Sequence, residues 1–179
     1  MANNRLDGKS VLLVIPQTQF REEEVFEPKR ILEKEGARVV VASTAARTCR
    51  GMKEGILESE VAIEDANGED YQAVVLAGGS SVPALFWKDK KLQELVSGMA
   101  EAGKIVAAIS LSTVVLAKAS LLEGRKATVY FLPEALEELK KGGATYVKDK
   151  VIVDENIIMA EGPQESGAFA KAVATALAG

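Results

Sequence analysis

The chain has 179 residues, of which 47% are hydrophobic and 27% are charged, and its 26 acidic and 22 basic residues give a net charge of −4. This composition is typical of a globular protein, and the length favours one domain, which we expect to span residues 1–179. The basic residues are scattered and are not interleaved with aromatic ones, which argues against nucleic-acid binding. No apolar run approaches the ~20 residues that cross a bilayer, so we expect no membrane segment.

The chain contains no histidine and a single cysteine, Cys49. One cysteine forms no internal disulfide, and the first residues, MANNRLDGKS, lack the apolar segment of a signal peptide. The sequence therefore predicts a cytoplasmic protein. Neither a metal site nor a cofactor is expected, because the residue patterns that bind metals and nucleotides are missing from the sequence.

The first half of the chain alternates apolar runs with a helical pattern. Residues 10–15 and 38–42 are rich in Val, Leu and Ile, which is typical of strands buried on both faces. Between them, residues 24–35 have the spacing of an amphipathic helix, in which Pro28 is expected near the first turn, where proline is tolerated. Residues 49–63 alternate around two glycines, and this pattern predicts a small hairpin or an extended excursion.

The middle of the chain repeats the alternation. Residues 73–77 and 105–109 are apolar runs that predict two further buried strands. Residues 90–102 and 112–119 have helical spacing. These elements complete a series in which strands and helices follow one another, the pattern of a parallel sheet with helices on its faces.

Shorter elements are expected towards the end of the chain. The predicted strands are 127–130, 145–147, 151–153 and 157–160, and the predicted helices are 133–141 and 164–177. The sequence as a whole predicts a three-layer α/β/α sandwich with a mostly parallel sheet. In such sheets ligands bind at the carboxyl ends of the strands, where the strand order reverses.

A candidate reactive residue lies where a strand runs directly into a helix. Residues 104–117 read KIVAAISLSTVVLA, so Ser110 follows the apolar run without a spacer. This arrangement is typical of a nucleophile elbow, although Ala108 and Ser112 stand where the Gly-x-Ser-x-Gly version has glycines. A serine nucleophile needs a base, and histidine is absent, so Ser110 is either a nucleophile or the N-cap of the helix that follows it.

Two further loops are expected near Ser110. Gly78 and Gly79 either expose backbone N–H groups to an anion or form a turn that needs positive φ. The acidic run Glu22 to Glu24 either stabilises the start of a helix or turns one carboxyl group towards Ser110. A carboxyl group buried in that position would have a raised pKa. The residues alone do not choose among the three glutamates.

The chain resembles the DJ-1/PfpI (ThiJ) superfamily over nearly its whole length. The resemblance is carried by the segments FREEEVFEPKRILEKEGARVVVAS, DYQAVVLAGG, KIVAAISLSTVVLAKASLLEGRKAT and VIVDENIIMAEGPQES. It implies a flavodoxin-like sandwich that is related to class I glutamine amidotransferase domains. It also implies assembly into homodimers or larger homo-oligomers.

The resemblance also implies a set of site residues. Ser110 matches the family's elbow cysteine. Glu24 matches the family's glutamate, which lies four residues before a proline in the first helix, here Pro28. The backbone N–H groups of Gly79 and Leu111 would form the oxyanion hole. Tyr130 is the nearest match to a histidine of one subgroup.

We expect this chain to keep the family's pocket, with Tyr130 and Ser112 beside it, and to have lost the thiol chemistry. The leading hypothesis is a binding or regulatory module, or a weak enzyme, with a small molecule as its partner. The alternatives are a Ser110-based hydrolase of the amidase or peptidase kind and a glyoxalase-like enzyme that uses Glu24. A third possibility is a purely structural oligomer subunit, which would have its pocket filled by side chains.

Overall fold

The computed structural model describes residues 4–179 and contains one central sheet of seven strands, in the order β11-β12-β8-β7-β1-β3-β6. The strands are β1 Ser10–Val14, β3 Arg38–Ser43, β6 Val61–Ala62, β7 Ala73–Leu76, β8 Ile105–Ile109, β11 Val151–Asp154 and β12 Ile157–Ala160. Neighbouring strands are parallel except for β11 and β12. The prediction of a mostly parallel sheet is therefore confirmed.

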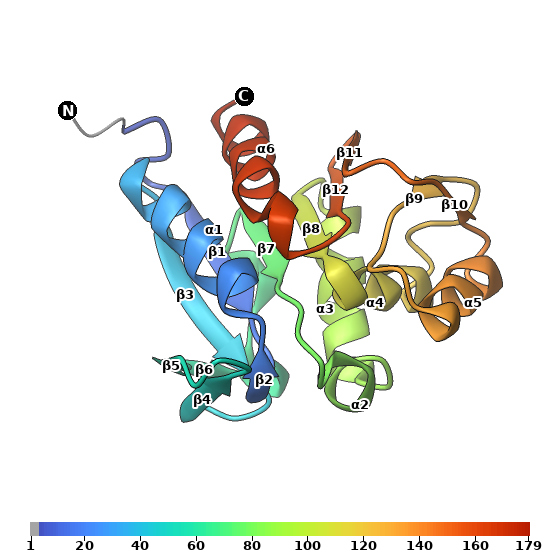
Figure 1. Cartoon of the computed structure of the whole chain (residues 1–179). Coiled ribbons are helices and arrows are strands. Elements are labelled where there is room, and N and C mark those ends of the chain that lie inside the picture. Colours follow the sequence, from blue (N-terminus) through green and yellow to red (C-terminus); the bar gives the residue numbers. More distant parts are fainter. Residues whose placement is uncertain (1–3) are drawn as a thin grey trace.

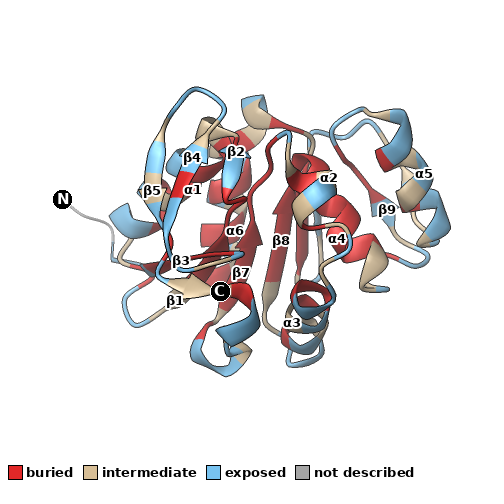
Figure 2. Cartoon of the chain, turned by 90° about the horizontal axis from the view of Figure 1, so that it is seen from below, coloured by how far each residue is buried: buried red, intermediate tan, exposed pale blue. Residues whose placement is uncertain are grey.

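Helices cover both faces of this sheet (Figure 1). On one face lie α1 (Glu22–Lys34) and α6 (Ser166–Ala178), and on the other lie α3 (Lys90–Glu101) and α4 (Thr113–Lys118). Successive side chains of β1 enter the two apolar cores alternately, because neighbouring residues of a strand point to opposite faces. Burial on both sides explains why the strands are continuous apolar runs, and Figure 2 shows β7 and β8 buried at the centre.

Smaller elements surround the central sheet. They are the strands β2 Thr18–Phe20, β4 Thr48–Gly51, β5 Ile56–Glu58, β9 Lys126–Ala127 and β10 Thr145–Tyr146, and the helices α2 Val82–Leu85 and α5 Pro133–Lys141. Strands β4 and β5 pair antiparallel, which confirms the predicted hairpin, and β2 joins them. The sequence patterns missed β2 and α2, which are too short to show a periodicity.

Several helices and strands begin or end at other residues than the sequence predicts. Helix α1 begins at Glu22, so Pro28 lies at its seventh position and not near the first turn. Since proline has no N–H, the carbonyl group of Glu24 has no helical donor four residues on. The strand expected at 127–130 ends at Ala127. Thr128 and Val129 are buried but form no strand, and the exposed residues Tyr130 and Phe131 then lead towards α5.

The helix expected at 112–119 also differs in its beginning. A 3-10 turn, Ser110–Ser112, precedes α4. Similarly, the last helix begins at Ser166 after the turn Pro163–Glu165, because the chain must first leave β12 and turn back over the sheet.

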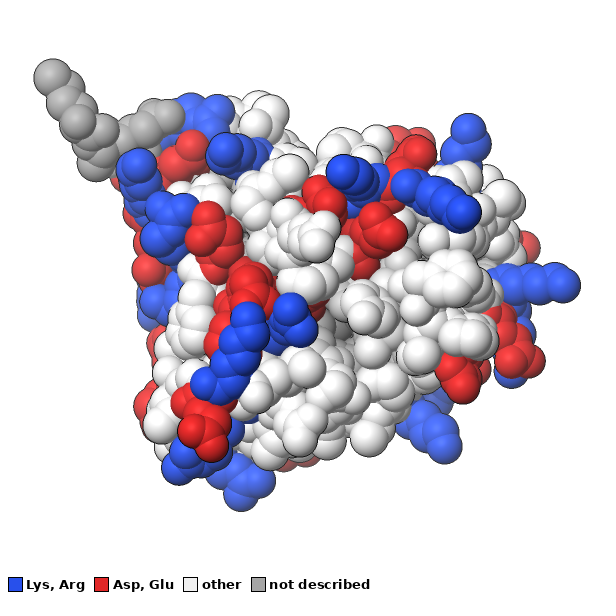
Figure 3. All heavy atoms as spheres, viewed as in Figure 1, with Lys and Arg blue, Asp and Glu red and all other residues white. Residues whose placement is uncertain are grey.

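The strand order reverses beside β1, which has β3 on one side and β7 on the other. The segments that follow β1, β7 and β8 meet at this edge of the sheet, and Phe20 and Gly79 form an antiparallel bridge there. None of the helices within residues 4–179 has the length and apolar composition needed to cross a bilayer. Figure 3 shows acidic and basic side chains interspersed on the side of the molecule that carries α1, where Lys29 pairs with Glu33 and Arg30 with Glu27.

Candidate functional site

Ser110 lies at a sharp bend directly after β8. Its φ angle is +63°, in the left-handed region that residues with a side chain rarely adopt. The bend is fixed by its neighbours: the Trp87 indole N–H donates to the Leu111 carbonyl at 3.0 Å, and the Ser112 hydroxyl donates to the Ala77 carbonyl at 2.6 Å. The hydroxyl of Ser110 makes no capping hydrogen bond. The geometry is thus that of an elbow, and the N-cap interpretation is not supported.

The structure selects Glu24 from the acidic run as the residue beside Ser110. Glu24 is completely buried in the first turn of α1. A methyl group added to Gly78 would overlap Glu24 Oε1 and would approach Ser110 Cβ to 2.9 Å. Only glycine fits between these two side chains. Gly79 is required for a different reason, because it has a φ of +151° and packs against the backbone of Gln19 and Phe20.

The carboxyl group of Glu24 is neutral at pH 7. Burial raises its pKa from 4.5 to about 8, while Gly78, Ser110 and Arg21 act in the opposite direction. Neither carboxyl oxygen has a well-aligned hydrogen-bond partner within residues 4–179. The hydroxyl of Ser110 and the backbone of Gly78 therefore lie near Glu24 without stabilising the charged form enough to offset desolvation.

A cavity of about 290 Å³ opens in front of these residues. It is lined by Arg21, Glu24, Met52, Gly79, Ser80, Pro83, Ser110, Leu111, Tyr130, Leu132 and Pro163. Leu111 contributes to the wall without filling the space. Tyr130 lies at the rim, where it is 49% exposed. Ser112 does not line this cavity: it is completely buried, because its hydroxyl turns away to bond the Ala77 carbonyl.

Two backbone N–H groups at the cavity wall have no obvious partner. Among the described residues, Gly79 donates to no other backbone group. Leu111 lies in the first helical turn after β8. Backbone N–H groups in a first turn have no carbonyl group one turn earlier in the helix to accept their hydrogen bond. The structure thus brings together Glu24, Gly79, Ser110 and Leu111, the set that the sequence resemblance implied.

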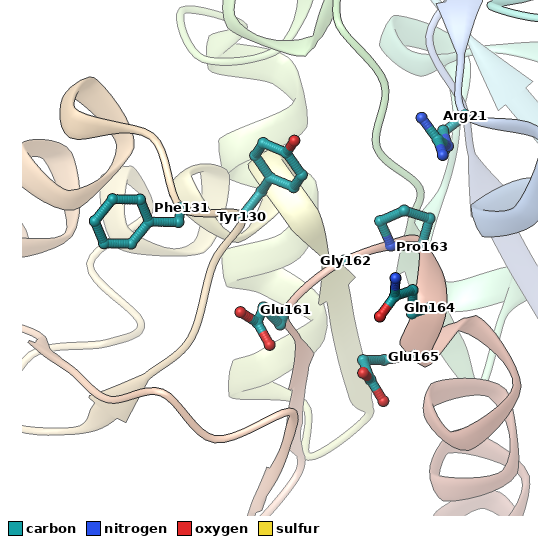
Figure 4. Close-up of a pocket in the computed structure, with 8 residues that line it drawn as sticks. All are labelled: Arg21, Tyr130, Phe131, Glu161, Gly162, Pro163, Gln164 and Glu165. Atoms are coloured by element: carbon teal, nitrogen blue, oxygen red, sulfur yellow. The ribbon is translucent and has the colours of Figure 1, made fainter.

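A second chamber of about 450 Å³ adjoins the first and shares Arg21, Tyr130 and Pro163 with it (Figure 4). The Nε atom of Arg21 donates to Glu23 at 2.6 Å, and Glu23 also pairs with Lys53. Lys53 and Arg21 lower the pKa of Glu23 to about 2. Glu23 in turn raises the pKa of Arg21, and Glu24 and Tyr130 add smaller contributions.

The sequence reasoning assigned no role to Arg21, although it stands next to the acidic run. The sequence does show a single basic residue directly before three acidic ones, in the loop after the first strand. That loop lies at the edge of the sheet where a ligand is expected. No group of three His, Cys, Asp or Glu side chains that could hold a metal ion occurs among residues 4–179. Cys49 is buried away from this site, with the Gln17 amide 3.3 Å from its sulfur.

The chain is similar in sequence and in fold to several known proteins. The model of the DJ-1/PfpI family matches residues 9–176. An uncharacterised protein of Methanocaldococcus jannaschii is 45% identical over 96% of this chain and 84% of its own length. A deglycase of Pyrococcus abyssi is 30% identical over 85% of this chain and 90% of its own. The crystal structure of a ThiJ/PfpI domain protein from Brachyspira murdochii has a TM-score of 0.89 and 32% identity, and covers 95% of this chain and 98% of that one.

Proposed function

We propose, since this chain belongs to the DJ-1/PfpI family, that it uses the cavity at Ser110 as a binding or regulatory site for a small molecule and has lost the family's thiol chemistry. Any catalysis that remains is weak. An open cavity beside the elbow favours this function over that of a purely structural subunit. The Pyrococcus abyssi relative is named a deglycase. We do not propose this activity as the main function of the present chain, because Ser110 stands where the family has its reactive cysteine.

One observation carries this proposal: Ser110 lies beside the completely buried carboxyl group of Glu24, and this burial favours the protonated form. A pKa of about 8 leaves roughly a tenth of Glu24 ionised at pH 7. A protonated carboxyl group donates a hydrogen bond but takes no proton from a hydroxyl group. The chain has no histidine to serve as the base. Without a base, a serine hydroxyl is a poor nucleophile.

The Ser110→Cys variant provides the direct test. We expect wild-type protein to consume methylglyoxal and to hydrolyse model amides far more slowly than Ser110→Cys, because a thiol ionises near neutral pH and a hydroxyl does not. Ser110→Ala is the matched control for background rates. The proposal is wrong if wild type turns over these substrates as fast as Ser110→Cys and Ser110→Ala abolishes the activity.

A second candidate is an enzyme in which Ser110 attacks and Glu24 transfers the proton. The left-handed bend at Ser110 and the free N–H groups of Gly79 and Leu111 favour it. A hydrolase or a glyoxalase-like enzyme of this kind would gain activity as pH rises through about 8, because Glu24 becomes a base only when ionised. Labelling of Ser110 by a fluorophosphonate, absent in Ser110→Ala, would support this candidate over the binding module.

We also propose that the chain forms a homodimer or larger homo-oligomer in the cytoplasm. Phe26, Met52 and Ile56 are exposed apolar side chains around the contact between α1 and the β4–β5 hairpin. Exposed apolar patches of this kind favour association. Light scattering of wild type and Ile56→Glu tests the assembly: the variant should have a lower mass, and a monomeric wild type would contradict the proposal. The single buried cysteine is compatible with a reducing compartment.

A further inference from the structure

Arg21 is the one basic residue that lines both chambers of the site. It directly precedes α1, and its side chain is about a third exposed (34%). Its Nε atom is held by Glu23, whereas its two terminal nitrogens make no hydrogen bond or ion pair within residues 4–179. The end of the guanidinium fork is therefore available to a ligand.

The surroundings of Arg21 keep this fork in place and leave it with a surplus of positive charge. Glu23 lies between Arg21 and Lys53 and pairs with both. The three side chains together carry one net positive charge. Because Nε is already occupied, only the two terminal nitrogens remain, and these match the two oxygens of a carboxylate in a bidentate pair.

Tyr130 supplies a second polar group on the same side of the chamber. In Figure 4, Arg21 and the Tyr130 hydroxyl lie in the upper half of the pocket, whereas Glu161 and Glu165 lie in the lower half. The inner chamber behind them is largely apolar, with Met52, Leu111 and Leu132 in its wall. A ligand that fits both regions has one anionic end and a short apolar body.

We propose that Arg21 and Tyr130 bind the carboxylate of a short-chain monocarboxylic acid whose apolar body occupies the inner chamber in front of Ser110. This inference rests on the proposed binding function and names its ligand class. Glu161 and Glu165 make no ion pair within the described part of the chain, so they repel a second carboxylate. Monocarboxylates are therefore preferred to dicarboxylates.

Isothermal titration calorimetry with 3-methylbutanoate, at pH 7 and low salt, tests the proposal. Its neutral amide, 3-methylbutanamide, and the dicarboxylate glutarate are the comparison ligands. We expect wild type to bind 3-methylbutanoate about tenfold or more tightly than either, because a charge-assisted bidentate pair is lost with the amide and repulsion is added with glutarate. Equal affinity for the acid and its amide would overturn the proposal.

Variants locate the binding group. Arg21→Met should weaken 3-methylbutanoate binding about tenfold or more, and Arg21→Lys should weaken it less, because the charge remains without the fork. Arg30→Met is the matched control: Arg30 lies on α1, the helix that Arg21 precedes, is 58% exposed, and lines neither chamber. Should Arg21→Met unfold, the comparison of acid with amide in wild type and in Arg21→Lys still decides the question. Unchanged affinity in the Arg21 variants would contradict the assignment.

The binding assay is independent of any chemistry at Ser110. The assay measures affinity alone and needs no turnover. If wild type proves to be a fast enzyme while the Arg21 variants lose carboxylate binding, the proposed function fails and this ligand class stands. If no carboxylate binds but turnover is slow, the ligand class fails and the binding role remains.

Discussion

Glu24→Gln tests the main electrostatic feature of the site, a neutral carboxyl group buried beside Ser110. Burial raises the pKa of Glu24 from 4.5 to about 8. Between these two pH values the folded protein holds a proton that the unfolded chain releases. Stability must therefore fall as pH rises from 4.5 to about 8 and then level off. Each unit of pKa difference corresponds to about 1.4 kcal/mol.

The size of the effect follows from these values. At about pH 5 the folded protein holds Glu24 neutral, like its Gln replacement, and ionisation in the unfolded chain costs wild type only about 1 kcal/mol. At pH 7 the proton linkage destabilises wild type by on the order of 3 kcal/mol, and above pH 8 by about 5 kcal/mol. Glu24→Gln lacks this linkage. Urea unfolding at about pH 5, 7 and 9 measures the free energy of unfolding of both proteins. The value for Glu24→Gln minus the value for wild type should increase with pH by these amounts.

Glu23→Gln serves as the control on the neighbouring position. Lys53 and Arg21 lower the pKa of Glu23 to about 2, so this carboxylate is ionised in the folded and unfolded states throughout the pH range of the experiment. Its stability difference from wild type should be constant with pH. If the curves of wild type and Glu24→Gln run parallel from pH 5 to 9, Glu24 does not have a raised pKa and the reasoning about a neutral carboxyl group is refuted.

Three further substitutions test the elbow. Ser112→Ala should lower the free energy of unfolding by about 1–3 kcal/mol, because the buried carbonyl of Ala77 loses its donor; urea denaturation showing no change would mean that this bond is unimportant. Gly78→Ala should destabilise the fold and weaken ligand binding, because the added methyl group overlaps Glu24 and approaches Ser110; calorimetry with unaltered affinity would speak against so close an approach. Ser110→Gly should raise stability by about 1 kcal/mol relative to Ser110→Ala, since glycine adopts the left-handed conformation without strain; equal melting temperatures of the two variants would indicate a relaxed bend.

The sequence was most informative where burial on both faces of the sheet left a continuous apolar run. Residues 10–15, 73–77 and 105–109 were recognised as strands for this reason, and their parallel pairing followed from the helices between them. The abrupt change from strand to helix at Ser110 also marked the bend. The choice of Glu24, by contrast, needed the family resemblance, because three adjacent acidic residues are indistinguishable by composition.

The remaining differences arise from tertiary contacts that local patterns do not encode. Helix α1 begins earlier than predicted, with Glu22 accepting hydrogen bonds from the backbone N–H groups of Lys53 and Gly55 in the distant hairpin. The expectation that Ser112 lies beside the pocket is wrong, although Ser112 is next but one to Ser110. In a tight turn, however, such neighbours point in different directions, and Ser112 points to the Ala77 carbonyl instead. Arg21 was overlooked because its role depends on chambers that form only when the chain folds.

The two parts of the cavity wall differ in how they are attached to the protein. Gly79 and Leu111 lie within three residues of the ends of the central strands β7 and β8. Arg21, Met52 and Tyr130 come from connecting segments outside the seven-stranded sheet. Mutations in those segments alter what enters the cavity without disturbing the framework below it. Ligand preference should therefore diverge faster than architecture during evolution, and grafting rim segments between homologues offers a practical route to redesigned selectivity.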